Sequence, residues 1–180
     1  MQPSRVQVRG FVRSLPRGRR HAGFFLGNHT YSHMDLDQNP AEAFEDDVLK
    51  NEPMLSTCAA GTDGHWLRFP YLREGNTAQK QDAVRAFLRD HGYRIAEVTY
   101  SADDWAYSDA YARCTLKGVQ ASIDWMRATY LQSIVDTLDL SWQEARLAVG
   151  RDVKHVGLFH IGGFTATRCP RRSGSCGSTV

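Results

Sequence analysis

Acidic residues are absent from the beginning of the chain. The first 34 residues contain no aspartate or glutamate, whereas 20 acidic residues follow from Asp35 onward in a chain of 180 residues. Six arginines lie in the acid-free part. The beginning of the chain is therefore strongly basic, although the net charge of the whole chain is only +2. These arginines are Arg5, Arg9, Arg13, Arg17, Arg19 and Arg20. Because Pro3 and Pro16 interrupt a segment with little apolar periodicity, we expect residues 1–22 to form an irregular arm.

The chain also lacks long apolar runs and closely spaced cysteine pairs. No segment approaches the roughly 20 apolar residues that a membrane span requires, and arginines break the apolar run that a secretory signal needs. We therefore expect no transmembrane segment and no signal peptide, while a transit peptide or a solvated arm stays open and localisation stays unknown. The cysteines show no Cys-x-x-Cys pair and give no sign of a disulfide framework or a zinc knuckle. They are Cys58, Cys114, Cys169 and Cys176.

The size and pattern of the chain predict one α/β domain. A chain of 180 residues with 42% hydrophobic residues can bury one core but is too short for two full-sized domains. Strand-like and helix-like segments alternate, which predicts parallel strand pairing. The expected strands are 23–26, 66–69, 93–100 and 156–161. The expected helices are 41–49, with an extension to Cys58 left open, 78–90, 119–138 and 141–148.

Three local patterns refine this prediction. Residues 101–116 lack clean periodicity and contain acidic and aromatic side chains, which is typical of a functional loop. Ser141-Trp142-Gln143-Glu144 is a capping box and predicts that a new helix begins there. The acids of the helix after Pro40 are expected to face water, and they are Glu42, Glu45, Asp46 and Asp47.

Two histidines four residues apart, His29 and His33, follow the first expected strand. This spacing predicts that both rings lie on the same side of one helical turn, so that both can bind one divalent ion. A pair with this spacing is, in isolation, more often solvated or hydrogen-bonded within the protein than bound to metal. In α/β sheets and barrels, active sites lie at the carboxyl ends of the strands, and the position of His29 after a strand therefore favours a site here.

Three further motifs follow the histidine pair, and they are Arg68-Phe69-Pro70-Tyr71, Asp103-Asp104-Trp105 and Leu158-Phe159-His160. Together with residues 28–33, this ordered set resembles the NodB-homology polysaccharide deacetylases, carbohydrate esterase family 4. The resemblance covers roughly residues 23–165. It implies a distorted (β/α) barrel that removes acetyl groups from N-acetylated sugars, such as chitin-like oligomers or peptidoglycan.

The resemblance also implies a metal site and an oxyanion contact. His29 and His33 would hold a divalent metal, usually zinc in such enzymes, which lowers the pKa of a bound water and polarises the amide carbonyl. The backbone N–H of Tyr71 would stabilise the tetrahedral oxyanion.

Five more residues receive roles from the same resemblance. Arg68 would orient the catalytic carboxylate, and His160, tuned by Asp104, would protonate the departing amine. Trp105 and Leu158 would wall the pocket that holds the acetyl methyl group. Each has a structural alternative: a salt bridge at a strand end for Arg68, a buried neutral ring for His160, and ordinary core packing for Trp105 and Leu158.

The sequence departs from the family pattern at both ends. The family's first motif is an Asp-Asp pair, which supplies the catalytic base and the third metal ligand, and no acid lies upstream of His29. A complete barrel would continue after His160 with another amphipathic helix and usually a closing strand. Residues 166–180 instead contain mainly Arg, Ser, Gly and Cys. We therefore expect a barrel incomplete at both ends, as a truncated or shifted reading frame would produce, with a deacetylase domain between a basic arm and a basic tail.

Three functions are compatible with these features. The first is a metal-dependent deacetylase whose activity is impaired by the missing Asp-Asp motif, with an N-acetylated polysaccharide or oligosaccharide as substrate. The second is a non-catalytic carbohydrate-binding or interaction module on the same scaffold. The third is a nucleic-acid contact through the arginines, but no aromatic interleaving or recognised nucleic-acid fold supports it. The oligomeric state stays open.

Overall fold

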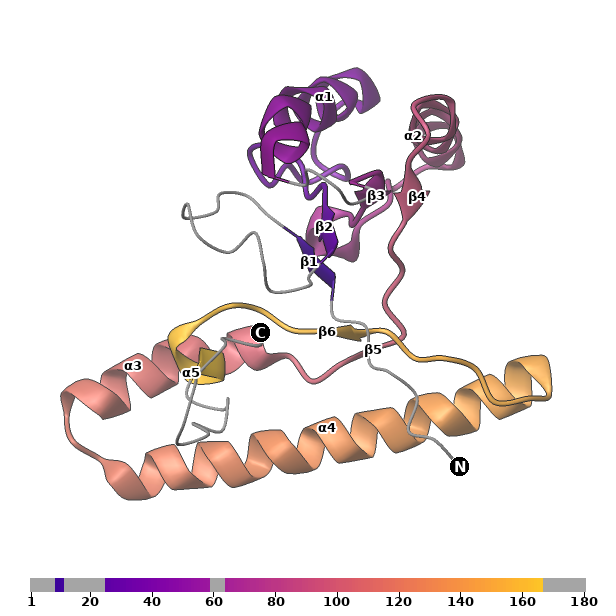
Figure 1. Ribbon diagram of the computed structural model, residues 1–180. Coiled ribbons are helices and arrows are strands. Elements are labelled where there is room, and N and C mark those ends of the chain that lie inside the picture. The colour runs from indigo at the N-terminus through magenta and orange to yellow at the C-terminus, as the bar shows by residue number, and fades with distance from the viewer. Residues whose placement is uncertain (1–8, 12–24, 59–63, 167–180) are drawn as a thin grey trace. The chain divides into compact units, whose positions relative to one another are not determined.

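The structure is a computed structural model that describes residues 9–11, 25–58 and 64–166. The chain divides into two compact units, Met1–Ala96 and Glu97–Thr179, each with its own buried cluster of apolar side chains. Figure 1 labels the helices and strands of both units.

Short parallel strands form the centre of the first unit. β1 (Arg9–Phe11) pairs with β2 (Phe25–Gly27), with Phe11 opposite Gly27. β3 (Trp66–Leu67) pairs with β4 (Arg94–Ile95) in the same parallel sense. A bridge between Asn28 and Leu67 joins the two pairs, so the strands follow one another in chain order.

The strand β1 lies inside the segment that was expected to be irregular. Its residues pair with β2, which begins at Phe25, close to the strand expected over residues 23–26. The other residues of the arm, including five of its six arginines, lie outside the described residues, as do residues 167–180 of the expected tail.

Helices connect these strands in the order that a βαβ pattern requires. α1 (Ala41–Cys58) lies between β2 and β3 and continues through Pro53, so the open extension is present. The 3₁₀ turn η1 (Pro70–Leu72) follows β3. α2 (Ala78–Asp90) begins after Thr77, whose hydroxyl accepts a hydrogen bond from the Lys80 N–H at 3.2 Å and caps the helix as predicted.

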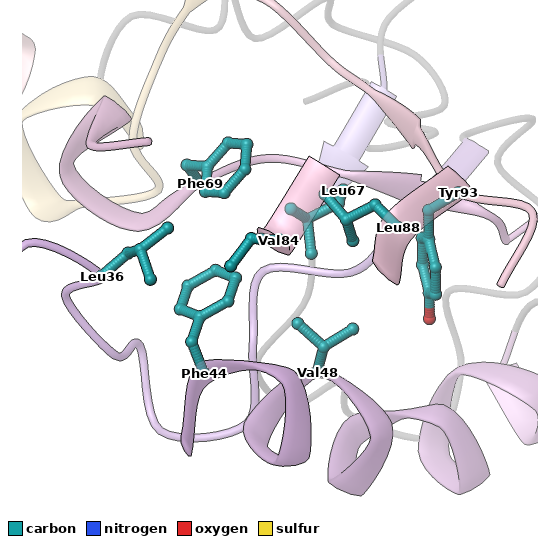
Figure 2. Packing of buried hydrophobic residues seen from close by; sticks show 8 residues of the cluster. All are labelled: Leu36, Phe44, Val48, Leu67, Phe69, Val84, Leu88 and Tyr93. Atoms are coloured by element: carbon teal, nitrogen blue, oxygen red, sulfur yellow. The ribbon is translucent and has the colours of Figure 1, made fainter. Parts of the chain in front are cut away.

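The core of the first unit lies between these helices and the strands (Figure 2). Phe44 stacks on Phe69 with ring centroids 5.6 Å apart, and Val48 of the same helix is fully buried. Such packing fixes α1 against the strands, because burial of large apolar side chains supplies most of the stabilisation of a small domain. The cluster contains Leu36, Phe44, Val48, Leu67, Phe69, Val84, Leu88 and Tyr93.

The second unit is mainly helical. Its parallel strands β5 (Tyr100–Ser101) and β6 (Gly157–Leu158) form a two-stranded sheet. Its helical segments are η2 (Asp104–Tyr107), α3 (Ser108–Leu116), α4 (Gln120–Val149) and α5 (Gly163–Ala166). Its core contains Ala102, Ile123, Met126, Tyr130 and Phe164.

Two predictions for this unit are wrong. Residues 101–116 are not an irregular loop, since η2 and α3 occupy most of them and Tyr107 and Tyr111 pack against Phe164. No new helix begins at Ser141, because α4 runs without a break. The Ser141 hydroxyl lies 2.9 Å from the Thr137 carbonyl, one turn earlier, and therefore does not cap a helix N-terminus.

Alternating parallel strands and helices in the first unit agree with the expected α/β class. A closed barrel is not seen in the part of the chain that the structure describes, where the strands form three two-stranded sheets. Among the described helices, none combines the length and the apolar character needed to cross a membrane.

Candidate functional site

The two histidines lie in a loop, not on a helix. Thr30 and His33 have positive φ angles of 57° and 63°, in the left-handed region that non-glycine residues rarely occupy. The prediction that both histidines share one helical turn is therefore wrong. The loop nevertheless brings the rings of His29 and His33 together, with centroids 4.8 Å apart and planes at 81°.

Asn28 anchors the start of this loop. Its side chain is fully buried, and its Oδ1 accepts hydrogen bonds from the Thr30 N–H at 2.9 Å and from Asn51 Nδ2 at 3.0 Å. Its Nδ2 donates to the Val48 carbonyl at 2.9 Å and to the Tyr93 hydroxyl at 3.0 Å. All four bonds connect the residue before His29 to buried partners, which fixes where the loop leaves β2.

Asp47 contacts the middle of the loop. It was expected to face water, but it is only 7% exposed, so that prediction is wrong. Its Oδ2 accepts hydrogen bonds from the Ser32 N–H at 2.9 Å and from the Ser32 hydroxyl at 3.0 Å, and its carbonyl accepts one from the Tyr31 N–H at 3.1 Å. The carboxylate is buried because loop donors replace its water.

The geometry of His29 suits a metal ligand. Its Nδ1 lies 2.7 Å from the Arg68 carbonyl, which can only accept, so Nδ1 carries the proton and Nε2 the lone pair. A backbone carbonyl bound to the second ring nitrogen is typical of metal-binding histidines. Two imidazoles that share one ion have centroids within roughly 6 Å of each other, so His29 and His33 fit as two nitrogen ligands.

A third ligand is not found among the described residues. No group of three His, Cys, Asp or Glu side chains that could hold a metal occurs within 9–11, 25–58 and 64–166. Asp35, the first acid after His33, forms an ion pair with Arg73 and accepts a hydrogen bond from the Asp37 N–H at 3.0 Å. The residues that follow β1 in the sequence, Val12-Arg13-Ser14, include no acid.

Arg68 and Tyr71 lie beside the histidines. Arg68 is 7% exposed, and its Nε donates to the Ala96 carbonyl at 3.2 Å while its own carbonyl accepts from His29. Tyr71 has a positive φ of 58° within η1, and its ring lies 4.7 Å from that of His33 at 81°. The first unit therefore brings four of the predicted site residues together.

The second unit pairs Asp104 with His160. The Asp104 side chain is 1% exposed, and its Oδ1 lies 2.7 Å from Nδ1 of His160, whose side chain is 46% exposed. Oδ2 accepts hydrogen bonds from the His160 N–H at 2.7 Å and from the Thr165 hydroxyl at 2.9 Å. Asp103, just before it, has a left-handed φ of 50°, which turns the chain between β5 and η2.

The two predicted pocket-wall residues differ in exposure. Trp105 is 59% exposed, so core packing does not explain it, while Leu158 is half-buried on β6, opposite Ser101. Sequence reasoning gave no role to Asp47, Asn51 or Thr165. A signal existed for the first two, because they share a helical face with the buried Phe44 and Val48.

The first unit thus consists of parallel βα units with a histidine pair beyond β2 and an Arg-Phe-Pro-Tyr turn beyond β3. A family model described as "Polysaccharide deacetylase" matches residues 15–96, which include both features. Residues 15–96, somewhat under half of the chain, therefore match the polysaccharide deacetylases, the family that the ordered motifs resemble, and the sequence as given has no Asp-Asp pair upstream of His29. The recognition made from the ordered motifs is confirmed.

A solved structure with a similar fold has a TM-score of 0.54 and 16% identity, over 89% of this chain and 49% of that chain. Its title describes a mutant of BA3943, "a CE4 family pseudoenzyme with restored enzymatic activity". This chain spans about half the length of that protein, and at this identity the likeness shows the fold alone. No curated protein matches the sequence.

Proposed function

We propose that this chain is a metal-dependent polysaccharide deacetylase of low turnover, which hydrolyses the acetamide of N-acetylated sugars in a chitin-like oligomer or peptidoglycan. One observation carries the proposal: the loop after β2 brings the rings of His29 and His33 within 4.8 Å, in the part of the chain that matches the family. A two-imidazole pair of this kind suits zinc or a similar divalent ion.

The bound ion would supply a water of lowered pKa and polarise the acetamide carbonyl. The chain's own residues orient the ligands: the Arg68 carbonyl accepts the Nδ1 proton of His29, so Nε2 is the nitrogen that would bind the ion. The exposed ring of Tyr71 lies next to His33, where a sugar would approach.

His160 is the proposed proton donor to the departing amine. Because Asp104 binds Nδ1, the proton that is transferred sits on Nε2, and the half-exposed ring allows that nitrogen to reach substrate. As the C–N bond breaks, the Nε2 proton passes to the amine, and the ring stays bound to the carboxylate in both protonation states. Trp105 and Leu158 are proposed to contact the acetyl methyl group.

The proposed low turnover concerns two groups, a third metal ligand and a general base. Catalytic zinc sites use three protein ligands, and the two imidazoles found among the described residues would leave an ion held mostly by water. In the sequence as given, no acid stands upstream of His29 to act as the general base, a group that typically contributes about 10²–10⁴-fold to the rate. The same absence favours the second candidate, a carbohydrate-binding module without turnover.

Acetate release from an N-acetylglucosamine oligomer, measured with zinc or cobalt added, tests the proposal. We expect slow, metal-dependent release that His29→Ala abolishes. His91→Ala is the matched control, because His91 is exposed at the end of α2 and its Nδ1 bonds only to the Phe87 carbonyl. Sugar binding with no acetate release under any metal would contradict the enzyme and support the module.

A further inference from the structure

The histidine loop has a backbone that local sequence does not favour. Two of its residues, Thr30 and His33, have left-handed φ angles although both carry a Cβ, and Thr is β-branched. Backbone of this kind persists only where surrounding contacts hold it. The contacts that hold residues 30–33 therefore determine whether the His29 and His33 rings meet.

Asp47 supplies contacts to two consecutive loop residues. Its carboxylate binds both the N–H and the hydroxyl of Ser32, at 2.9 and 3.0 Å, and its carbonyl binds the Tyr31 N–H at 3.1 Å. Two further side chains accept one hydrogen bond each at this loop. The Asn28 side chain accepts from the Thr30 N–H, and the Thr30 hydroxyl accepts from the Met34 N–H. Lys50 of the same helix also contacts the loop, with its Nζ 4.3 Å from the centroid of the Tyr31 ring. Asp47, however, is the α1 residue whose side chain is hydrogen-bonded to the loop, and its bonds to Ser32 are charge-assisted.

The part of α1 that carries Asp47 is held in place by core packing. Its neighbours on α1, Phe44 and Val48, are fully buried in the core, and Figure 2 shows both pointing from the helix into that core. Position 47 is thereby fixed relative to β3, whose next residue, Arg68, accepts the hydrogen bond from His29.

We propose that Asp47 is a positioning residue for metal binding, whose carboxylate holds the 30–33 loop so that His29 and His33 face a single divalent cation. The inference rests on the proposed metal site but assigns the loop geometry to a residue outside the ligand set. Loss of a partner that orients a ligand typically weakens metal binding by about 10–100-fold.

Zinc affinity of the purified chain tests this role. We expect Asp47→Ala to raise the Kd for zinc by about 10–100-fold, and Asp47→Asn, which keeps an acceptor oxygen, to raise it less. Asp46→Ala is the matched control, since Asp46 is the exposed neighbour on α1, and its Kd should stay within roughly twofold of the wild type. A folded Asp47→Ala protein with the wild-type Kd would overturn the inference.

A second measurement needs no metal. Hydrogen exchange at the Ser32 amide of the metal-free chain should be slow in the wild type and in Asp46→Ala, and faster in Asp47→Ala or, if that variant does not fold, in Asp47→Asn. Unchanged exchange in the folded variant contradicts the positioning role. The wild type could instead bind no zinc while the Ser32 amide still exchanges faster in the Asp47 variant. That result would contradict the proposed function and the metal role of Asp47, but it would support the contact of Asp47 with the loop.

Discussion

Asp104 and His160 are joined by two hydrogen bonds, one from the ring and one from the backbone, each 2.7 Å long. The Thr165 hydroxyl adds a third donor at 2.9 Å. Since the carboxylate is 1% exposed, these three donors replace the water that would otherwise solvate it. The carboxylate therefore stabilises the fold of the second unit as well as the orientation of the histidine ring.

Replacing Asp104 by alanine should destabilise the chain. We expect the free energy of unfolding to fall by about 2–3 kcal/mol, because charge-assisted hydrogen bonds are lost and the His160 N–H and the Thr165 hydroxyl lose their acceptor. Urea denaturation followed by circular dichroism measures this loss. Asp103→Asn is the control, since Asp103 is exposed and asparagine tolerates its left-handed φ. Equal losses in both variants would show that the buried carboxylate is not the cause.

Phe164 holds the segment that carries Thr165. It is fully buried, stacks on Tyr107 with centroids 4.9 Å apart, and meets Tyr130 edge-on at 5.3 Å. Phe164→Ala should lower the free energy of unfolding by about 3–5 kcal/mol, because it leaves a cavity among aromatic rings. Phe159→Ala, at a site 46% exposed, should cost less than about 1 kcal/mol in the same urea titration. A small loss for Phe164→Ala would mean that the core collapses around the missing ring.

Elements with a strong local signal are the ones that the sequence predicts well. The helix after Thr77 shows an apolar stripe and a capping hydroxyl, and α2 begins and ends where these signals place it. The helix after Pro40 runs to Cys58 despite Pro53, because Phe44, Val48 and Leu55 keep one face buried along its length.

The loop that joins His29 to His33 could not be predicted in the same way. A spacing of four residues fits a helical turn, but the loop conformation depends on Asp47, which lies 15 positions from Ser32 in the sequence. Likewise, Ser141 has the sequence of a helix start, yet it lies inside α4, where its hydroxyl also reaches the Thr99 carbonyl at 3.0 Å. In both cases tertiary contacts override a local pattern.

Thr77→Ala tests the cap of α2. The hydroxyl satisfies the Lys80 N–H, one of the donors that a helix N-terminus leaves without an intrahelical partner, so its loss should cost about 1 kcal/mol. Thr57→Ala is the matched control, because the Thr57 hydroxyl is exposed and donates to the Pro53 carbonyl inside α1. Thermal unfolding should show a lower Tm for Thr77→Ala alone. A Tm equal to that of the wild type would indicate that a neighbouring group replaces the cap.

Tyr93 should make stability depend on alkaline pH. Burial, as the largest cause, raises the pKa of its phenol from the ordinary value of 10.0 to about 12. The Glu52 carboxylate, which accepts its hydrogen bond at 3.1 Å, raises the pKa further, whereas the bond from Asn28 lowers it. The folded state therefore favours the neutral phenol, and this stabilisation is complete below pH 10 and is lost as the pH rises from about 10 through about 12.

The loss can be measured as the free energy of unfolding in urea between about pH 9 and pH 11.5. Wild type should lose on the order of 2 kcal/mol more than Tyr93→Phe over this range, because phenylalanine has no proton to release. Tyr93→Phe itself should be less stable near neutral pH, where Asn28 Nδ2 keeps only its bond to the Val48 carbonyl. Glu52→Gln removes a smaller contribution to the shift and should give an intermediate slope. Parallel curves for wild type and Tyr93→Phe would show that the phenol does not stay neutral in the folded chain, and hence that water reaches the Asn28 anchor of the histidine loop.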